Sequence, residues 1–106
     1  MELKALILAI LEDRPRHGYE IVQGARGKLR FEEGTIYPLL HKLERENLLS
    51  SQWKKASTGK ERKYYTLTRR GKAALARARV AWKDYVRVVS EILLGGRRGA
   101  AGESAS

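Results

Sequence analysis

The 106-residue chain has no cysteine and no long apolar run, and each absence excludes a class of protein. Without cysteine, neither a disulfide framework nor a thiolate metal site is available. The N-terminal apolar stretch LKALILAIL is interrupted by Lys4 and followed by Glu12 and Asp13. It therefore lacks the form of a signal peptide and falls far short of the ~20 apolar residues that span a membrane. We expect one small domain in the cytoplasm, with dimerisation as a way to enlarge its core.

Acidic residues are too few to balance the basic ones, and the excess is localised. The net charge is +10; residues 1–49 are neutral, residues 50–72 carry +7 and residues 73–106 carry +3. A local positive patch attracts polyanions more selectively than diffuse charge does. Nucleic acid is the first candidate partner and an anionic membrane the second. The plain alternative is an arginine-rich composition without functional meaning.

Apolar spacing predicts three helices in the first half of the chain, over residues 2–12, 17–26 and 33–47. The third should end near Asn47, because asparagine tolerates the left-handed conformation found at helix C-termini. The third has an apolar face at i, i+3, i+4 and i+7, formed by Ile36, Leu39, Leu40 and Leu43. Its opposite face is unusual for a solvated helix surface, because it combines a glycine and a proline with basic and aromatic residues. This face carries Gly34, Pro38, His41 and Arg45, flanked by Tyr37 and Lys42.

Two short strands are expected next, over residues 48–54 and 62–68, joined by a polar linker that contains Ser, Thr and Gly. A lone hairpin is only marginally stable in water, so it must pack on the helices. We expect Tyr64 and Tyr65 to be structural, because one face of the second strand must pack on the helical core.

A long helix is predicted over residues 68–94, with Thr68 as its N-cap and two glycines after its end. Its apolar residues follow the 3-4 spacing of a coiled-coil seam, namely Leu75, Ala78, Trp82, Tyr85, Val89 and Ile92. The helix is longer than a body of this size can cover, so we expect it to pair with its copy in a homodimer. The predicted domains are residues 1–67, the helix 68–95 and a disordered tail 96–106.

The order of these elements predicts a mainly α fold with a small β-hairpin, of the α+β class. Three helices followed by a two-stranded hairpin make a winged helix-turn-helix domain, here followed by a long C-terminal dimerisation helix. In that architecture the third helix lies in the DNA major groove. The hairpin, or wing, touches the flanking backbone.

Three segments resemble the PadR family of bacterial transcriptional regulators: HGYEI (17–21), EGTIYPLLHKLERENLL (33–49) and RKYYTLTRRGKAAL (62–75). The single C-terminal helix is similar to that of the short subfamily, which includes drug-sensing repressors. The chain departs from the family pattern at Glu32 and Asn47. The resemblance implies a homodimeric DNA-binding regulator, usually a repressor, whose affinity for a palindromic operator is tuned by an effector.

On this interpretation the third helix, the start of the second and the wing contact DNA. The candidate residues are Tyr19, Thr35, Tyr37, Pro38, His41, Lys42, Lys60, Arg62 and Lys63. Alternatives remain for some of them. Tyr37 can pack beside the second helix, Tyr19 can pack under the wing, and Lys42 can form a solvated i,i+4 pair.

The long helix supplies two further candidate sets. The dimer interface is assigned to Leu75, Trp82, Val89 and Ile92. Trp82 lies near the middle of the helix, so two-fold symmetry would bring both indoles close together, beside small alanines. An effector site for a flat aromatic molecule is therefore assigned to Ala78, Trp82 and Tyr85, which the resemblance to drug-sensing members supports. The alternative is that Trp82 fills the dimer core.

No constellation of nucleophile, base and oxyanion donors is evident, so we predict no enzyme activity, no metal and no cofactor. His17 and His41 lie in separate elements and have no companion ligand. Two other functions remain open. A nonspecific architectural DNA-binding protein would show little sequence preference, and a protein-interaction module would act without DNA. Membrane binding is disfavoured because the basic residues flank a hairpin.

Overall fold

The computed structural model describes residues 2–24, 29–55 and 57–95. These residues fall into two units, one within Met1–Leu75 and the other within Ala76–Ser106. The predicted disordered tail, residues 96–106, lies outside the described residues.

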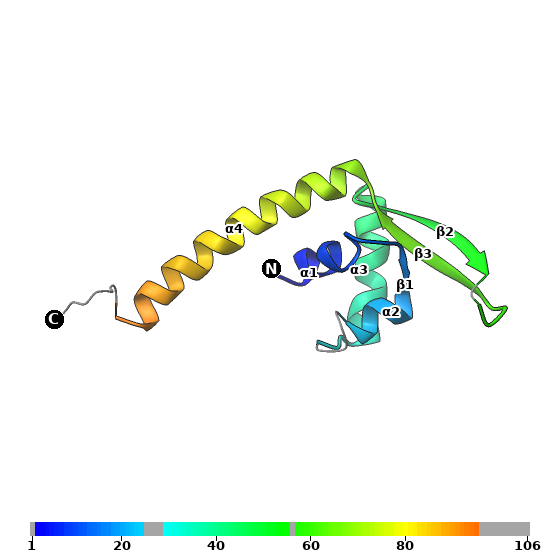
Figure 1. Cartoon of the computed structure of the whole chain (residues 1–106), viewed down its shortest axis with the longest axis horizontal. Helices are drawn as coiled ribbons and strands as arrows, with labels where there is room; N and C mark the ends of the chain where they lie inside the picture. The colour runs from blue at the N-terminus through cyan, green and yellow to red at the C-terminus, as the bar shows by residue number, and fades with distance from the viewer. Residues whose placement is uncertain (1, 25–28, 56, 96–106) are drawn as a thin grey trace. The chain divides into compact units, whose positions relative to one another are not determined.

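The first unit combines helices with a small antiparallel sheet whose strand order is β1-β3-β2 (Figure 1). The predicted α+β class is confirmed. Strands β2 and β3 form the hairpin, which is the wing of the domain, and it starts close to the C-terminal end of α3. The elements are α1 (Glu2–Ile10), β1 (Arg16–His17), α2 (Gly18–Gln23), α3 (Glu33–Arg45), β2 (Leu49–Lys55), β3 (Glu61–Leu67) and α4 (Arg69–Leu93).

The third strand is a correction to the predicted two-stranded hairpin. Arg16 and His17 pair with Tyr65 and Tyr64 of β3. The segment 17–26 was expected to be helical throughout, but α2 covers only Gly18–Gln23 and Gly24 follows it with a φ of +83°. A two-residue strand is too short to show an alternating pattern, so the sequence contains no signal for β1.

The other predicted elements are present with small shifts at their ends. The strands expected at 48–54 and 62–68 lie at 49–55 and 61–67, and the long helix expected at 68–94 lies at 69–93. Helix α1 ends at Ile10 rather than near residue 12. End shifts of one or two residues are ordinary for helices and do not alter the arrangement.

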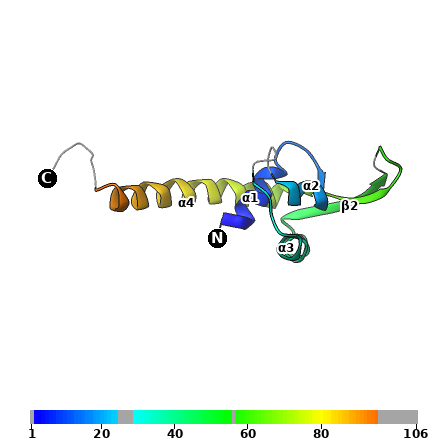
Figure 2. The same cartoon turned by 90° about the horizontal axis from the view of Figure 1, so that it is seen from below.

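The core of the first unit collects the apolar faces of the helices against the sheet. Helix α3 contacts β2, and Figure 2, in which α3 is seen end-on, shows β2 leading away from it. The predicted inward face of α3 is confirmed, since Ile36, Leu40 and Leu43 are fully buried and Leu39 is partly buried. The buried apolar residues of the other elements are Ile7, Leu8, Ile10, Ile21, Val22, Leu49, Tyr65, Leu67 and Leu75.

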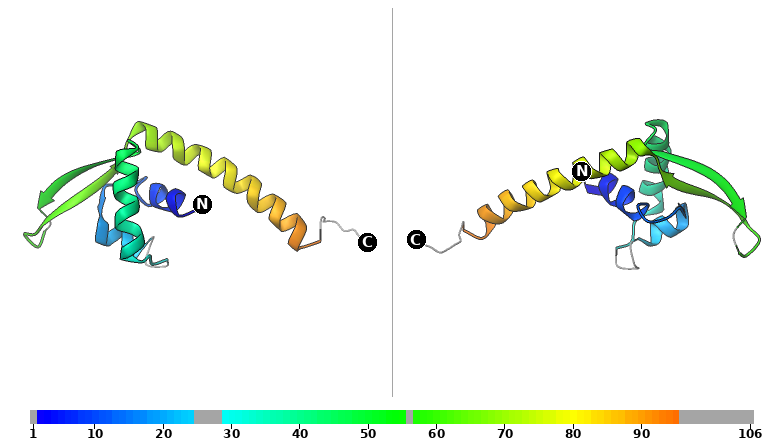
Figure 3. Two further views of the ribbon diagram at one scale, coloured as in Figure 1. Left: turned by 180° about the vertical axis from the view of Figure 1, so that it is seen from behind. Right: turned by 45° about the horizontal axis from the view of Figure 1, so that its top comes forward.

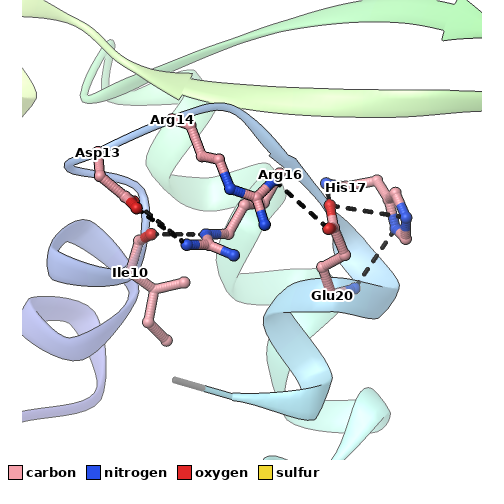
Figure 4. Close-up of polar contacts among 6 residues, drawn as sticks. All are labelled: Ile10, Asp13, Arg14, Arg16, His17 and Glu20. Atoms are coloured by element: carbon pink, nitrogen blue, oxygen red, sulfur yellow. Dashed lines mark hydrogen bonds and ion pairs between the residues drawn. The ribbon is translucent and has the colours of Figure 1, made fainter. Parts of the chain in front are cut away.

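A polar network fixes the connection from α1 to α2 (Figure 4). Arg16 Nε donates a hydrogen bond to the Ile10 carbonyl at 2.9 Å, and its guanidinium pairs with Asp13 at 3.2 Å. His17 caps α2, because its Nδ1 accepts from the Glu20 N–H while the Glu20 carboxylate accepts from the His17 N–H. Burial lowers the pKa of His17, which favours the neutral imidazole that this cap requires. The start of α2 is therefore held in place beside the sheet.

Two predicted caps are confirmed where α3 leads into β2 and β3 leads into α4. Asn47 adopts a left-handed conformation with a φ of +63°, as expected at the end of α3. Thr68 accepts the Gly71 N–H at 2.9 Å and donates its hydroxyl to the Asn47 carbonyl at 2.7 Å. A Cβ at Gly71 would overlap the Leu48 carbonyl oxygen, so the first turn of α4 approaches the α3–β2 turn as closely as backbone allows.

The second unit contains the remainder of α4, from Ala76 to Leu93. The complete helix has 25 residues and a length of about 38 Å. Several large apolar side chains in this part are exposed to solvent in the single chain: Val80, Trp82, Tyr85, Val86, Val88, Ile92 and Leu93. Among the described helices, none combines the length and the apolar character that a membrane span requires.

Candidate nucleic-acid interface

Helix α3 presents its unusual face to solvent. Seen from behind in the left view of Figure 3, α3 lies in front of α1 and α2, and no other described element of the first unit covers its near side. The exposed residues of this face are Gly34, Thr35, Pro38, His41, Lys42 and Arg45. All of the predicted contact residues on this helix except Tyr37 are therefore exposed.

Gly34 and Pro38 give this face an accessible backbone. Proline has no N–H, so Pro38 cannot donate the helical hydrogen bond to the Gly34 carbonyl four residues earlier. Gly34 has no side chain, and a Cβ placed there would meet nothing within 4 Å. A ligand can thus approach the first turns of α3 more closely than it could approach an ordinary helix.

The charges along α3 follow the helix dipole. Glu33 lies in the first turn, and Lys42 and Arg45 lie in the last turn, so each sign is at the favourable end. Glu32 is the N-cap residue, but its side chain makes no capping hydrogen bond. The positive charge of the exposed face is therefore concentrated in its C-terminal half.

Tyr37 lies at the border of this face rather than on it. Its ring is half-buried and packs against α2, so closely that a Cβ at Gly18 would overlap the Tyr37 ring. This is the packing alternative that the sequence left open; contact of Tyr37 with DNA stays a prediction. Tyr19, the second residue of α2, is half-exposed.

The wing carries a cluster of five basic residues. Lys54, Lys55 and Lys60 are exposed, whereas Arg62 and Lys63 are half-buried. Across the strands Lys54 faces Arg62, and Lys55 faces Glu61, the one acidic residue of the described wing. The exposed lysines of the hairpin therefore form the positively charged surface that the sequence predicts.

Glu44 links the wing to α3. Its carboxylate accepts a hydrogen bond from the Ser51 hydroxyl at 2.5 Å and pairs with Lys63 Nζ at 3.3 Å. The bond from Ser51 is the main reason that the pKa of the Glu44 carboxyl is below its ordinary value, and Lys63 lowers it further although burial raises it. Lys63 Nζ also lies 5.5 Å from the centre of the Tyr65 ring. The Glu44 carboxylate therefore links α3 to both strands of the wing.

The two wing tyrosines are structural, as predicted. Tyr65 is buried in the core. Tyr64 is half-buried, and its ring meets the His17 ring edge-on at a centroid distance of 5.3 Å. Lys63 and Tyr65 lie on the face of the hairpin that contacts α3, and Tyr64 lies on the other face.

The candidate residues for dimerisation and effector binding all lie on α4, and their exposure is that of one chain without a partner. Leu75 is buried in the first unit, Val89 is half-buried and Ile92 is exposed. The rings of Trp82 and Tyr85 are 5.8 Å apart, and both are about half-exposed. Asp84, a neighbour expected to favour a cation, is paired with Arg87 at 2.6 Å.

Sequence reasoning did not single out Glu44, Ser51 or Trp53. The link through Glu44 depends on the register of a distant hairpin, which no local pattern specifies. Trp53 did carry a signal, because an aromatic residue directly before two lysines in a predicted strand is unusual for a buried position. Within residues 2–24, 29–55 and 57–95, no three acidic or histidine side chains are close enough to bind a metal ion.

Comparison with known proteins gives a consistent result. The model of the family described as "Transcriptional regulator PadR-like family" matches residues 7–77. The transcriptional regulator Rv3488 of Mycobacterium tuberculosis is 36% identical over 93 residues, which cover 88% of this chain and 73% of that protein.

Solved structures agree with this match. A PadR family transcription regulator from Clostridium difficile is 35% identical, with a TM-score of 0.79 over 88% of this chain and 99% of the other. The structure of Bacillus subtilis PadR in complex with operator DNA is 32% identical, with a TM-score of 0.63. That match covers 71% of this chain and 44% of the Bacillus chain.

Proposed function

The chain belongs to the PadR-like family of transcriptional regulators, and we propose that it is a dimeric, sequence-specific DNA-binding repressor that a small effector releases from its operator. The observation that carries the proposal is the exposed face of α3 beside a basic wing. The similar Bacillus protein was crystallised with operator DNA, which supports the same partner for this chain.

In this proposal α3 enters the major groove and the wing follows the flanking phosphates. Thr35, Pro38, His41 and Lys42 are exposed on α3 and face the bases, with Tyr37 at their border. Phosphates are contacted by the wing and the start of α2, through Lys60, Arg62, Lys63 and Tyr19. Contact by Lys63 requires it to leave Glu44 or to bind phosphate while paired.

Dimerisation is proposed through α4. A single chain leaves Trp82, Tyr85 and Ile92 largely exposed along one seam, and a copy of the same helix would remove them from water. Leu75 is already buried within the first unit, so it would add little new buried surface to the dimer interface. A dimer presents two copies of α3, which matches the two half-sites of a palindromic operator.

Selection of bound sites from a pool of random duplexes tests the function. A regulator enriches one palindromic sequence and holds it against an excess of bulk genomic DNA. An architectural protein would enrich none and would be displaced. Binding to a protein partner that depends neither on DNA nor on salt concentration would favour the interaction-module alternative instead.

The proposed location is the bacterial cytoplasm, on the nucleoid.

Replacing Gly34 by alanine is expected to raise stability and weaken DNA binding at the same time. Alanine favours a helix by up to about 1 kcal/mol over glycine, and the new methyl meets nothing in the free protein. In the complex, the same methyl would occupy space that the DNA needs for its close approach to α3. It should therefore reduce the affinity for DNA by about tenfold. Thermal unfolding and a mobility-shift titration measure the two effects. A variant that is more stable but binds DNA as tightly as the parent would show that DNA does not approach Gly34.

Planar aromatic compounds are expected to bind beside Trp82 in the dimer and to lower operator affinity. If they alter the angle between protomers, the coupling would be in the usual range of about 5–150-fold. Because Asp84 is paired with Arg87, a positive charge on the compound is less important than a flat ring.

The measurement uses a Trp53→Phe background, in which Trp82 is the only tryptophan. Binding should quench its fluorescence, and Trp82→Ala should abolish binding. If a panel of flat dyes leaves the Trp82 signal unchanged, Trp82 is a core residue of the dimer and the effector site is wrong.

A further inference from the structure

Trp53 is the most exposed aromatic side chain of the described first unit, with 65% of its surface open to solvent. It lies in β2 directly opposite Lys63 of β3. Since side chains on paired strands alternate between faces, Trp53 shares a face with Ser51, Lys55 and Lys63. Ser51 and Lys63 both contact Glu44 of α3. Trp53 is therefore on the α3 side of the wing, two residue pairs farther out than Ser51.

The surroundings of Trp53 are charged and polar rather than apolar. Its neighbours on the same face are Ser51 and Lys55 along β2 and Lys63 across the hairpin, with Glu61 opposite Lys55. Tyr65, the nearest aromatic residue on this face, is buried. A single exposed indole among amines is too small for an ordinary protein-binding patch, which needs contiguous apolar surface. It is suited to a partner that combines negative charge with local apolar surface.

We propose that Trp53 is an apolar DNA contact of the wing, packing its indole against deoxyribose rings at the edge of the groove that the wing follows. This inference rests on the proposed DNA-binding function and adds a contact that is not electrostatic. In a duplex the base faces are stacked on one another, so sugar C–H groups are the accessible apolar surface near the phosphates. Lys55, on the same face, and Lys54, on the opposite face of β2, would neutralise phosphates near the indole, as would Lys60.

An apolar contact and a phosphate contact differ in their response to salt. Neutralising a phosphate releases condensed counterions, whereas burying an indole against a sugar does not. Trp53→Ala is therefore expected to weaken duplex binding by about tenfold per protomer at every salt concentration, with an unchanged salt slope. The matched variant Lys54→Ala, its immediate neighbour, should lower the slope by about one. Trp53→Phe should retain most of the affinity because the ring is kept.

Fluorescence gives an independent measurement of the same contact. In the Trp82→Phe chain, Trp53 is the only tryptophan. We expect its emission to shift to shorter wavelength, and its quenching by acrylamide to fall, when a duplex recovered from the random pool is added. The affinity of the Trp82→Phe chain in the same titration serves as the reference.

Both measurements are made on a complex that a mobility shift has shown to form. If Trp53 remains as accessible to acrylamide in that complex as in the free protein, the contact does not exist. If Trp53→Ala binds as tightly as the parent, or flattens the salt slope as Lys54→Ala does, the apolar contact is equally wrong. Absence of any shifted complex would instead overturn the proposed function and this inference with it.

Discussion

Raising the salt concentration from about 50 to about 200 mM is expected to weaken binding of the operator duplex by roughly 10³–10⁵-fold. This range applies to a protein that makes about 6–10 phosphate contacts. Each protomer of a dimer offers several exposed or half-exposed cations for that purpose on the wing and on α3. They are Lys42, Lys54, Lys55, Lys60 and Arg62. A mobility-shift titration at several salt concentrations gives the slope directly.

Variants of the wing identify the residues that produce this dependence. Lys60→Ala and Arg62→Ala together should weaken binding to all sequences by similar factors and flatten the salt slope. Lys63→Ala should change the slope less than Lys60→Ala, because Glu44 already neutralises its charge. Thr35→Ala, on the exposed face of α3, should instead reduce the preference for operator over random DNA. If the double wing variant binds as tightly as the parent, the wing does not contact phosphate.

Val89→Arg is expected to dissociate the dimer and, with it, to abolish tight operator binding. The substitution places an unpaired charge in the proposed α4 seam, and a dry site of this kind costs about 3–5 kcal/mol. Sedimentation at micromolar protein should then change from a dimer to the 12.0 kDa monomer. The loss of affinity follows because one protomer can hold only one half-site.

Val80→Arg is the matched control for that experiment. Val80 is 70% exposed and, by helical spacing, lies on the side of α4 opposite Trp82 and Val89. The same change of side chain at Val80 should leave a dimer intact. A parent chain that already sediments as a monomer, or a Val89→Arg chain that sediments like the parent, would show that α4 does not form the interface.

The elements with regular periodicity were predictable from the sequence. The apolar positions of α3 and the length of α4 follow from helical spacing, and both appear in the structure within one or two residues. Asn47 and Thr68 were also predictable, because each residue type has a specific role at a helix end. In contrast, β1 has only two residues. His17 is both the second residue of β1 and the N-cap of α2. No local preference indicates such a double role.

The candidate site was predictable in its surface and not in its contacts. An exposed α3 face with Pro38 and His41 follows from the position of the buried face opposite. The packing of Tyr37 on Gly18 depends on how α2 and α3 meet, and the bond from Ser51 to Glu44 depends on the hairpin register. Both are long-range properties of the assembled domain.

The position of β1 also determines how the first unit can assemble over time. The β2–β3 hairpin is a local structure, and hairpins form within about 1–10 μs. Pairing of Arg16 with Tyr65 instead closes a loop that contains α2, α3 and β2. The chain therefore loses the conformational entropy of this loop before the contacts between the elements can compensate for it. Since β3 is shared by both pairings, the sheet is complete only after the helices between them have docked. The wing can therefore take up its register early as a local hairpin, whereas β1 and the start of α2 join the sheet in a late, non-local step.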